Sequence, residues 1–232
     1  RGLTLQKTPV HELAESLGLT VKTTLPKAEE IQKQGIDRIV VVAYGEKIPK
    51  EIHDRYFCLN IHPSLLPKYR GASPLQSVLL NGDSKTGVTI MLVSEKMDTG
   101  DIILQKETPV DINENLKSLH DRLAKWGAQM LLEALELDLE EVRQKQNESQ
   151  ATLCKKIKKE DSLINWNQPA SKIHNQVRAI TGFTLHKGKR VKILETKLNG
   201  DQLEIVRIQP EGKSVMSYAD FVKGYGELEK KN

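Results

Sequence analysis

The sequence predicts an α/β fold in which a mostly parallel sheet is followed by a small C-terminal domain rich in strands. Residues 38–44 form a β-branched run without polar alternation between Gly35 and Gly45, which is typical of a buried parallel strand. Helical and strand patterns alternate up to residue 145, whereas three short strand patterns follow one another after residue 182. An α/β sheet domain is therefore joined to a separate β module.

The composition is that of an ordered protein with one sizeable core. The chain has 232 residues, of which 38% are hydrophobic and 28% are charged. No apolar run approaches the roughly 20 residues that span a bilayer, and nothing resembles a signal peptide. We therefore expect no membrane partner and a cytoplasmic location, with an organellar matrix as the alternative. Cys58 and Cys154 lie far apart and are expected to be reduced thiols.

The N-terminal third predicts one surface helix and a βαβ unit. The helix runs from Thr8-Pro9 to Gly18, because proline favours the first helical turn and glycine favours the end of a helix. The strand at 38–44 and a second strand at 58–62 are separated by a short helix at 50–56. The apolar residues of the first helix share one face: Val10, Leu13, Ala14 and Leu17.

The middle of the chain predicts two more helices and a pair of strands. Ser73 and Pro74 are expected to cap and open a helix that stops at Asn81-Gly82. Strands at 86–93 and 101–110 flank the turn that contains Asp98 and are expected to pair antiparallel. A long amphipathic helix follows from residue 115 to about residue 145.

The polar segment at 144–150 contains no large apolar residue and marks a domain boundary. Beyond it, a helix is predicted at 169–180. Three strands follow at 183–186, 190–198 and 202–209, and Asn199-Gly200-Asp201 predicts a hairpin between the last two.

The positive charge is concentrated in the C-terminal third. Residues 151–232 carry 16 Lys+Arg against 9 Asp+Glu, whereas residues 1–150 carry 19 against 22. Such an asymmetry fits a polyanionic partner for the C-terminal part, but a solvated lysine-rich surface accounts for it as well, because a surplus of this size is common on domains that bind no nucleic acid.

Asn60, His62 and Asp98 are the candidate catalytic residues. Asn60 and His62 are two residues apart on a predicted strand, so their side chains point to the same face. A carboxamide can donate to an oxyanion, and an imidazole can move a proton near neutral pH. Asp98, in a tight turn, could orient that imidazole. Taken singly, His62 also fits a structural hydrogen-bonding role, and Asp98 also fits a turn former.

The run from Asn60 to Pro67, followed by Asp98, resembles the motif of the folate-dependent formyltransferases. The matching residues are Asn60, His62, Ser64, Leu65, Leu66, Pro67 and Asp98. Flanking segments resemble those members of the family that act on methionyl-tRNA: 69–76, 86–91 and 97–101. The tail resembles the same members at 156–161, 164–166, 173–174, 177–179, 208–213 and 216–217.

This resemblance implies a fold and a reaction. Residues 1–146 would form a Rossmann-like catalytic domain, 147–152 a linker and 153–232 a β-barrel-like domain of oligonucleotide-binding (OB) type that binds tRNA. The implied reaction transfers a formyl group from 10-formyltetrahydrofolate to the α-amino group of methionyl initiator tRNA, in translation initiation. The implied partners are the folate donor and the tRNA acceptor stem, with a monomeric protein and no metal.

The resemblance also assigns roles to residues. Asn60 and His62 would stabilise the oxyanion, and Asp98 would orient His62 and assist proton movement. The pteridine would meet the backbone of Val42, Ala43, Tyr44, Gly45, Ser64, Leu65, Leu66 and Pro67. The tRNA contacts would be Arg1, Arg70, Lys156 and Lys158.

The chain departs from the family pattern at two places. It opens on Arg1, where relatives have a preceding strand and helix, so we expect a missing N-terminal segment and a sheet one strand short. The connection at 198–201 is shorter than usual, which predicts an abbreviated C-terminal domain and weaker tRNA affinity. Two alternatives remain open, namely a formyltransferase acting on a small amine such as a sugar nucleotide, and an inactive remnant that binds RNA or folate.

Overall fold

The computed structural model describes residues 6–230. Contacts within the chain divide it into two units, residues 1–37 and 38–232. The predicted tRNA contact at Arg1 lies outside the described residues. No helix in the described part of the chain is long and apolar enough to cross a bilayer.

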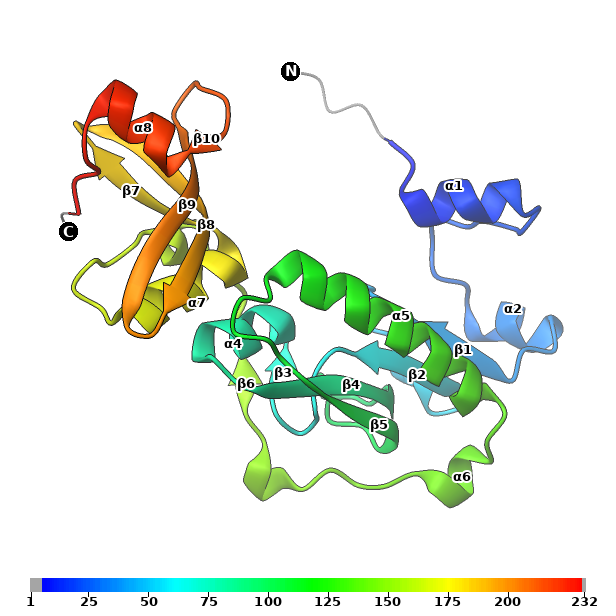
Figure 1. Ribbon diagram of the computed structural model, residues 1–232. Helices are drawn as coiled ribbons and strands as arrows, with labels where there is room; N and C mark the ends of the chain where they lie inside the picture. Colours follow the sequence, from blue (N-terminus) through cyan, green and yellow to red (C-terminus); the bar gives the residue numbers. More distant parts are fainter. Residues whose placement is uncertain (1–5, 231–232) are drawn as a thin grey trace. The chain divides into compact units, whose positions relative to one another are not determined.

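The first unit contains α1 (Pro9–Ser16) and α2 (Ala28–Lys33) (Figure 1). The Thr8 hydroxyl accepts a hydrogen bond from the His11 N–H, and Pro9 stands in the first turn, which confirms the predicted start of α1. The helix ends before Gly18, as predicted. Its large apolar side chains are exposed: Val10, Leu13 and Leu17.

The second unit is built on a four-stranded sheet in the order β1-β2-β4-β5. The crossover from β1 (Arg38–Val41) through α3 (Lys50–His53) to β2 (Phe57–His62) is parallel, which confirms the βαβ unit. β4 (Lys85–Leu92) pairs antiparallel with both β2 and β5 (Ile102–Pro109). The antiparallel pairing of β4 with β5 was predicted, but β4 also runs antiparallel to β2, so the sheet of the described strands is mixed rather than mostly parallel.

Helix α5 (Leu116–Leu135) covers one face of this sheet (Figure 1). A Cβ on Gly127 would lie 2.7 Å from the Ile61 side chain, so the helix approaches β2 closely. The helix ends ten residues earlier than predicted, because Asp138 caps a new short helix, α6 (Leu139–Val142). The core between helix and sheet contains Leu59, Val88, Ile90, Leu119, Leu123 and Met130.

Helix α4 (Pro74–Asn81) begins and ends where the sequence predicted, with Gly82 in a left-handed conformation at its end. Ser73 was expected to cap this helix, but its side chain makes no capping hydrogen bond. The Ser73 carbonyl instead accepts a hydrogen bond from the Ser77 hydroxyl, at 2.8 Å.

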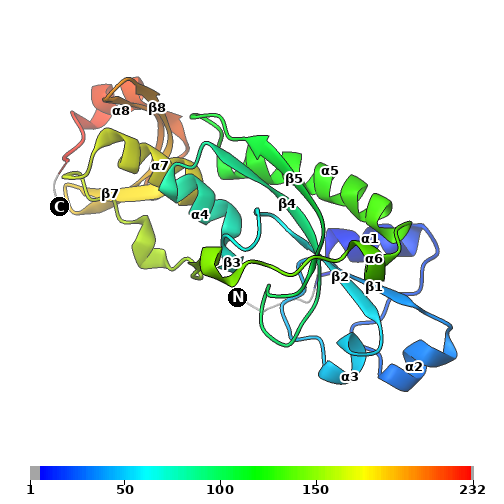
Figure 2. The same cartoon turned by 90° about the horizontal axis from the view of Figure 1, so that it is seen from below.

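The segment after α6 returns along the sheet on the side away from α5 (Figure 2). It includes the 3-10 turn η1 (Glu148–Gln150) and β6 (Leu153–Cys154), which pairs parallel with β3 (Arg70–Gly71). Neither short strand was predicted. From here on we call residues 143–154 the linker, a segment longer than the predicted linker at 147–152.

The C-terminal part contains one antiparallel sheet in the order β10-β9-β8-β7. The predicted helix and three predicted strands are confirmed, as is the hairpin between β8 and β9. These four strands do not confirm a barrel of OB type. The elements are η2 (Lys159–Ser162), α7 (Ala170–Ile180), β7 (Gly182–His186), β8 (Lys189–Asn199), β9 (Gln202–Pro210), β10 (Met216–Ser217) and α8 (Tyr218–Tyr225).

Candidate active site

The side chains of strand β2 alternate between the two faces of the sheet. Ile61 points toward α5, so Asn60 and His62 point to the linker side, as the alternation of a strand requires. His62 is 4% exposed. Asn60 is half-buried, and among residues 6–230 its carboxamide makes no hydrogen bond. The amide is therefore free to donate to a bound group.

The two nitrogens of His62 have different surroundings. Nε2 lies 3.0 Å from the carbonyl oxygen of Tyr69, which accepts only a proton-bearing nitrogen. Nδ1 lies 3.7 Å from Oδ1 of Asp98. Burial lowers the pKa of His62, and the Asp98 carboxylate opposes that shift. The neutral ring thus keeps its lone pair on Nδ1, beside a carboxylate that can stabilise an added proton.

The loop between β4 and β5 brings Asp98 to this position. Asp98 has a φ of 56°, in the left-handed region that Asp tolerates better than most side chains. Its Oδ2 accepts a hydrogen bond from the Gly71 N–H at 2.8 Å. Gly71 has a φ of 118°, and a Cβ there would lie 2.4 Å from the Cys154 carbonyl oxygen. Only glycine therefore allows this backbone to contact both Asp98 and β6.

The two predicted folate-binding segments differ in their surroundings. In the first, Val42 is 58% exposed and Tyr44 is 42% exposed; Ala43 and Gly45 are also exposed. In the second, Ser64 and Leu66 are buried, and Leu65 and Pro67 are partly buried. The Leu66 carbonyl accepts a hydrogen bond from Gln105 on β5 at 2.9 Å. The second segment is thus held firmly against the sheet.

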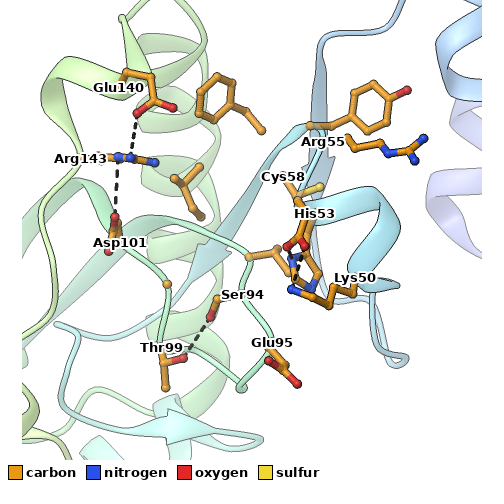
Figure 3. Close-up of a pocket in the computed structure, with 16 residues that line it drawn as sticks. Lys50, His53, Arg55, Cys58, Ser94, Glu95, Thr99, Asp101, Glu140 and Arg143 are labelled. Carbon is orange, nitrogen blue, oxygen red and sulfur yellow. Dashed lines mark hydrogen bonds and ion pairs between the residues drawn. The ribbon is translucent and has the colours of Figure 1, made fainter. Parts of the chain in front are cut away.

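A cavity of about 590 Å³ is lined by residues on both sides of Asp98 in the loop between β4 and β5 (Figure 3), although none of Asn60, His62 and Asp98 lines it. Its walls include Ser94 and Thr99, which flank Asp98 in sequence and are hydrogen-bonded to each other at 3.0 Å. Cys58 also lines it and stands on the same face of β2 as Asn60 and His62. None of the eight predicted folate-binding residues lines this cavity.

The sequence did not predict this cavity, although the alternation of side chains along β2 places Cys58 on the same face as Asn60 and His62. The other walls come from distant segments, which no local pattern joins. Burial raises the pKa of the Cys58 thiol to about 11, so this wall is neutral at physiological pH. The cavity is further lined by His53, Phe57, Leu92, Val93, Glu95, Gly100, Asp101, Glu140 and Arg143.

The predicted tRNA contacts fall into two groups. Arg70 is 4% exposed, and its guanidinium makes two hydrogen bonds with Glu148, at 2.9 and 2.7 Å. Lys156 and Lys158 are exposed, and no ion pair involves either within residues 6–230. A buried, paired guanidinium is poorly placed to meet a phosphate, whereas the two lysines are accessible.

A family model described as formyl transferase matches residues 1–135, and one described as formyl transferase, C-terminal domain, matches residues 156–202. The chain belongs to the formyl transferase family. This confirms the family resemblance of the Asn60–Pro67 motif. The second match ends at Gln202, the first residue of β9, directly after the connection that the sequence predicted to be shortened.

Known proteins similar to this formyl transferase include a methionyl-tRNA formyltransferase from Ehrlichia ruminantium. It is 40% identical to this chain, and the aligned region covers 97% of this chain and 84% of the relative. A methionyl-tRNA formyltransferase from Clostridium thermocellum shares the fold, with a TM-score of 0.65, 24% identity and coverage of 83% and 85% of the two chains. WlaRD, a sugar 3N-formyl transferase solved with dTDP and 5-N-formyl-THF, has a TM-score of 0.65, 22% identity and coverage of 90% and 83%.

Proposed function

We propose that this protein transfers a formyl group from 10-formyltetrahydrofolate to the α-amino group of methionyl initiator tRNA. The observation that carries the proposal is the unpartnered carboxamide of Asn60 on the same strand face as His62, whose free nitrogen faces Asp98. The similarity to methionyl-tRNA formyltransferases over 97% of the chain supports the choice of acceptor.

Each of the three side chains has a role that follows from its surroundings. Asn60 donates an N–H to the formyl oxygen as negative charge develops on it. His62 takes a proton at Nδ1, since Nε2 is held by the Tyr69 carbonyl. Asp98 stabilises the positive ring that results. The amine adds to the formyl carbon and gives its proton to Nδ1 of His62. The C–N bond to the folate then breaks, and His62 returns that proton to the folate nitrogen.

We place the pteridine of the donor in the cavity beside the Asp98 loop. The cavity volume, about 590 Å³, lies within the range of small-molecule sites. Apolar side chains such as Phe57 and Leu92 can contact the flat ring, and the Ser94 and Thr99 hydroxyls can meet its polar edge. The segments at 42–45 and 64–67 would then flank the rest of the donor.

The acceptor stem of the tRNA is proposed to meet the exposed lysines that follow the linker. Four of them lie within five residues: Lys155, Lys156, Lys158 and Lys159. We do not include Arg70 in this surface, because it is buried. The C-terminal sheet would act as the OB-type tRNA-binding domain. All three catalytic side chains come from one chain, so we propose that the protein acts as a monomer. We also propose that it acts in the cytoplasm.

Asp98→Asn is expected to slow formylation of methionyl-tRNA by roughly 10²- to 10⁴-fold, because an amide cannot stabilise the protonated ring. The measurement is donor-dependent formylation by the full chain. Asp121→Asn, which neutralises an exposed carboxylate on α5, is the matched control. A loss smaller than roughly threefold in Asp98→Asn would contradict the assigned role. Turnover of an amino sugar without turnover of methionyl-tRNA would favour the small-amine alternative.

Lys156→Ala and Lys158→Ala are expected to weaken tRNA binding and to reduce its salt dependence by about one unit of slope each. Donor binding should not change. The control is Lys117→Ala, which removes an exposed lysine from α5 that is paired with Asp121. Equal tRNA affinity of all variants at low salt would contradict the proposed surface.

A further inference from the structure

Gln146, in the linker, contacts the backbone on both sides of the Asp98–Gly100 turn. Its Nε2 donates to the carbonyl oxygens of Asp98 and Gly100, at 2.9 and 2.7 Å. Its Oε1 accepts from Nε of Arg70, at 2.9 Å. Gln146 is 9% exposed, so both ends of its carboxamide are engaged in a nearly dry environment. Its hydrogen bonds therefore fix the backbone conformation of the turn at residues 98–100.

The same linker contacts the other catalytic loop. The Thr152 N–H donates to the Pro67 carbonyl at 3.1 Å, and the Thr152 hydroxyl accepts from the Tyr69 N–H at 2.8 Å. Tyr69 is the residue whose carbonyl holds Nε2 of His62. The linker therefore bridges the loop that follows His62 and the loop that carries Asp98.

Arg70 explains how Gln146 is held. Its guanidinium is fixed by Glu148, five residues before β6, and its Nε donates to the Gln146 oxygen. The next residue, Gly71, supplies the N–H that binds the Asp98 carboxylate. Two linked contacts thus define the position of Asp98, one on its backbone carbonyl and one on its carboxylate.

We propose that Gln146 is a positioning residue, which holds the left-handed backbone of Asp98 so that its carboxylate faces Nδ1 of His62. This inference rests on the proposed function, because it assumes that the His62–Asp98 pair serves formyl transfer. It makes the linker part of the catalytic site and gives Arg70 a supporting role through Gln146.

Gln146→Ala in the full chain is expected to lower kcat by about 10- to 100-fold while KM for donor and tRNA changes little, because the loss is one of orientation. Gln146→Glu should lose as much, since a carboxylate can accept from Arg70 but cannot donate to the two carbonyls. Gln176→Ala is the matched control, because Gln176 also donates from Nε2 to two backbone carbonyls, those of Asp161 and Leu163. An unchanged kcat in a folded Gln146→Ala would overturn the inference.

A double-mutant cycle separates positioning from a general loss of stability. If Gln146 acts through Asp98, adding Gln146→Ala to Asp98→Asn should cost less than roughly threefold more. Multiplication of the two losses would show that Gln146 acts independently of Asp98, and the inference would be wrong.

Titration of His62 by NMR gives a readout that needs no activity. The Asp98 carboxylate raises the pKa of His62 against the effect of burial, so Asp98→Asn should lower it further. Gln146→Ala should move the titration in the same direction, and Gln176→Ala should not. An unmoved His62 titration in Gln146→Ala overturns the inference even if the proposed function holds. If the wild-type chain shows no formyl transfer but the His62 titrations of the variants shift as expected, only the proposed function is overturned.

Discussion

His62 shows how a single residue acquires a defined chemistry from its neighbours. Its ring is 4% exposed, and a carbonyl occupies one nitrogen. Only the other nitrogen, Nδ1, can accept or release a proton, and it lies next to Asp98. The sequence predicted that Asn60 and His62 share a face, because alternation along a strand is a local property. It could not predict which nitrogen is free, because that depends on Tyr69 in a loop that folds back.

The pH dependence of kcat should report this ring. Burial lowers the pKa of His62 below its ordinary value of 6.5, so the neutral, proton-accepting form persists into mildly acidic solution. We expect the acidic fall of kcat to lie below about pH 6.5 rather than above it. The measurement is a kcat profile from about pH 5 to about pH 8. A fall centred above neutral pH would contradict this assignment.

At the scale of elements, the loop between β4 and β5 decides the geometry of the site. The sequence predicted both strands and their antiparallel pairing, because a short turn separates two apolar runs. It also predicted that Asp98, in the turn, could orient the His62 ring, but not the contacts that hold the turn there. The loop must fold back over β2, and this path is fixed by hydrogen bonds from Gly71 and Gln146, which are 27 and 48 residues away.

Gly100→Ala should disturb this loop. A Cβ on Gly100 would lie 1.8 Å from the Leu92 carbonyl oxygen, far inside contact distance, so the turn must shift. A displacement of about 1 Å in Asp98 is expected to cost on the order of 10² in kcat. Gly224→Ala is the control, because a Cβ there meets nothing within 4 Å. Kinetics and thermal unfolding of both variants provide the check, and full activity of Gly100→Ala would refute the prediction.

At the scale of the whole molecule, helix α7 joins the C-terminal sheet to the loop between β5 and α5. His174 on α7 lies 2.9 Å from the Ile112 carbonyl and 2.9 Å from the Thr196 hydroxyl. Arg178, one turn later, donates to the carbonyls of Asp111 and Glu114. The sequence predicted the helix but not this contact, since each partner is more than 20 residues away.

His174 should make stability depend on pH. Burial lowers its pKa from 6.5, so the unfolded chain binds a proton that the folded chain resists. The free energy of unfolding should therefore fall as the pH drops below about 6.5. His174→Gln should flatten this dependence in denaturant titrations, with His120→Gln as the matched loss of an exposed imidazole. An equally steep dependence in His174→Gln would contradict the prediction.

The sequence by itself determined the order of the longer helices and strands, the βαβ unit and the common face of Asn60 and His62. These features follow from periodicity over a few residues, which local backbone geometry imposes. The tertiary structure decided that the sheet is mixed and that Asp98 lies beside Nδ1 of His62. It also decided that Arg70 is buried against a linker 76 residues away. Those outcomes depend on hydrogen bonds between distant segments, whose partners carry no local signal of each other.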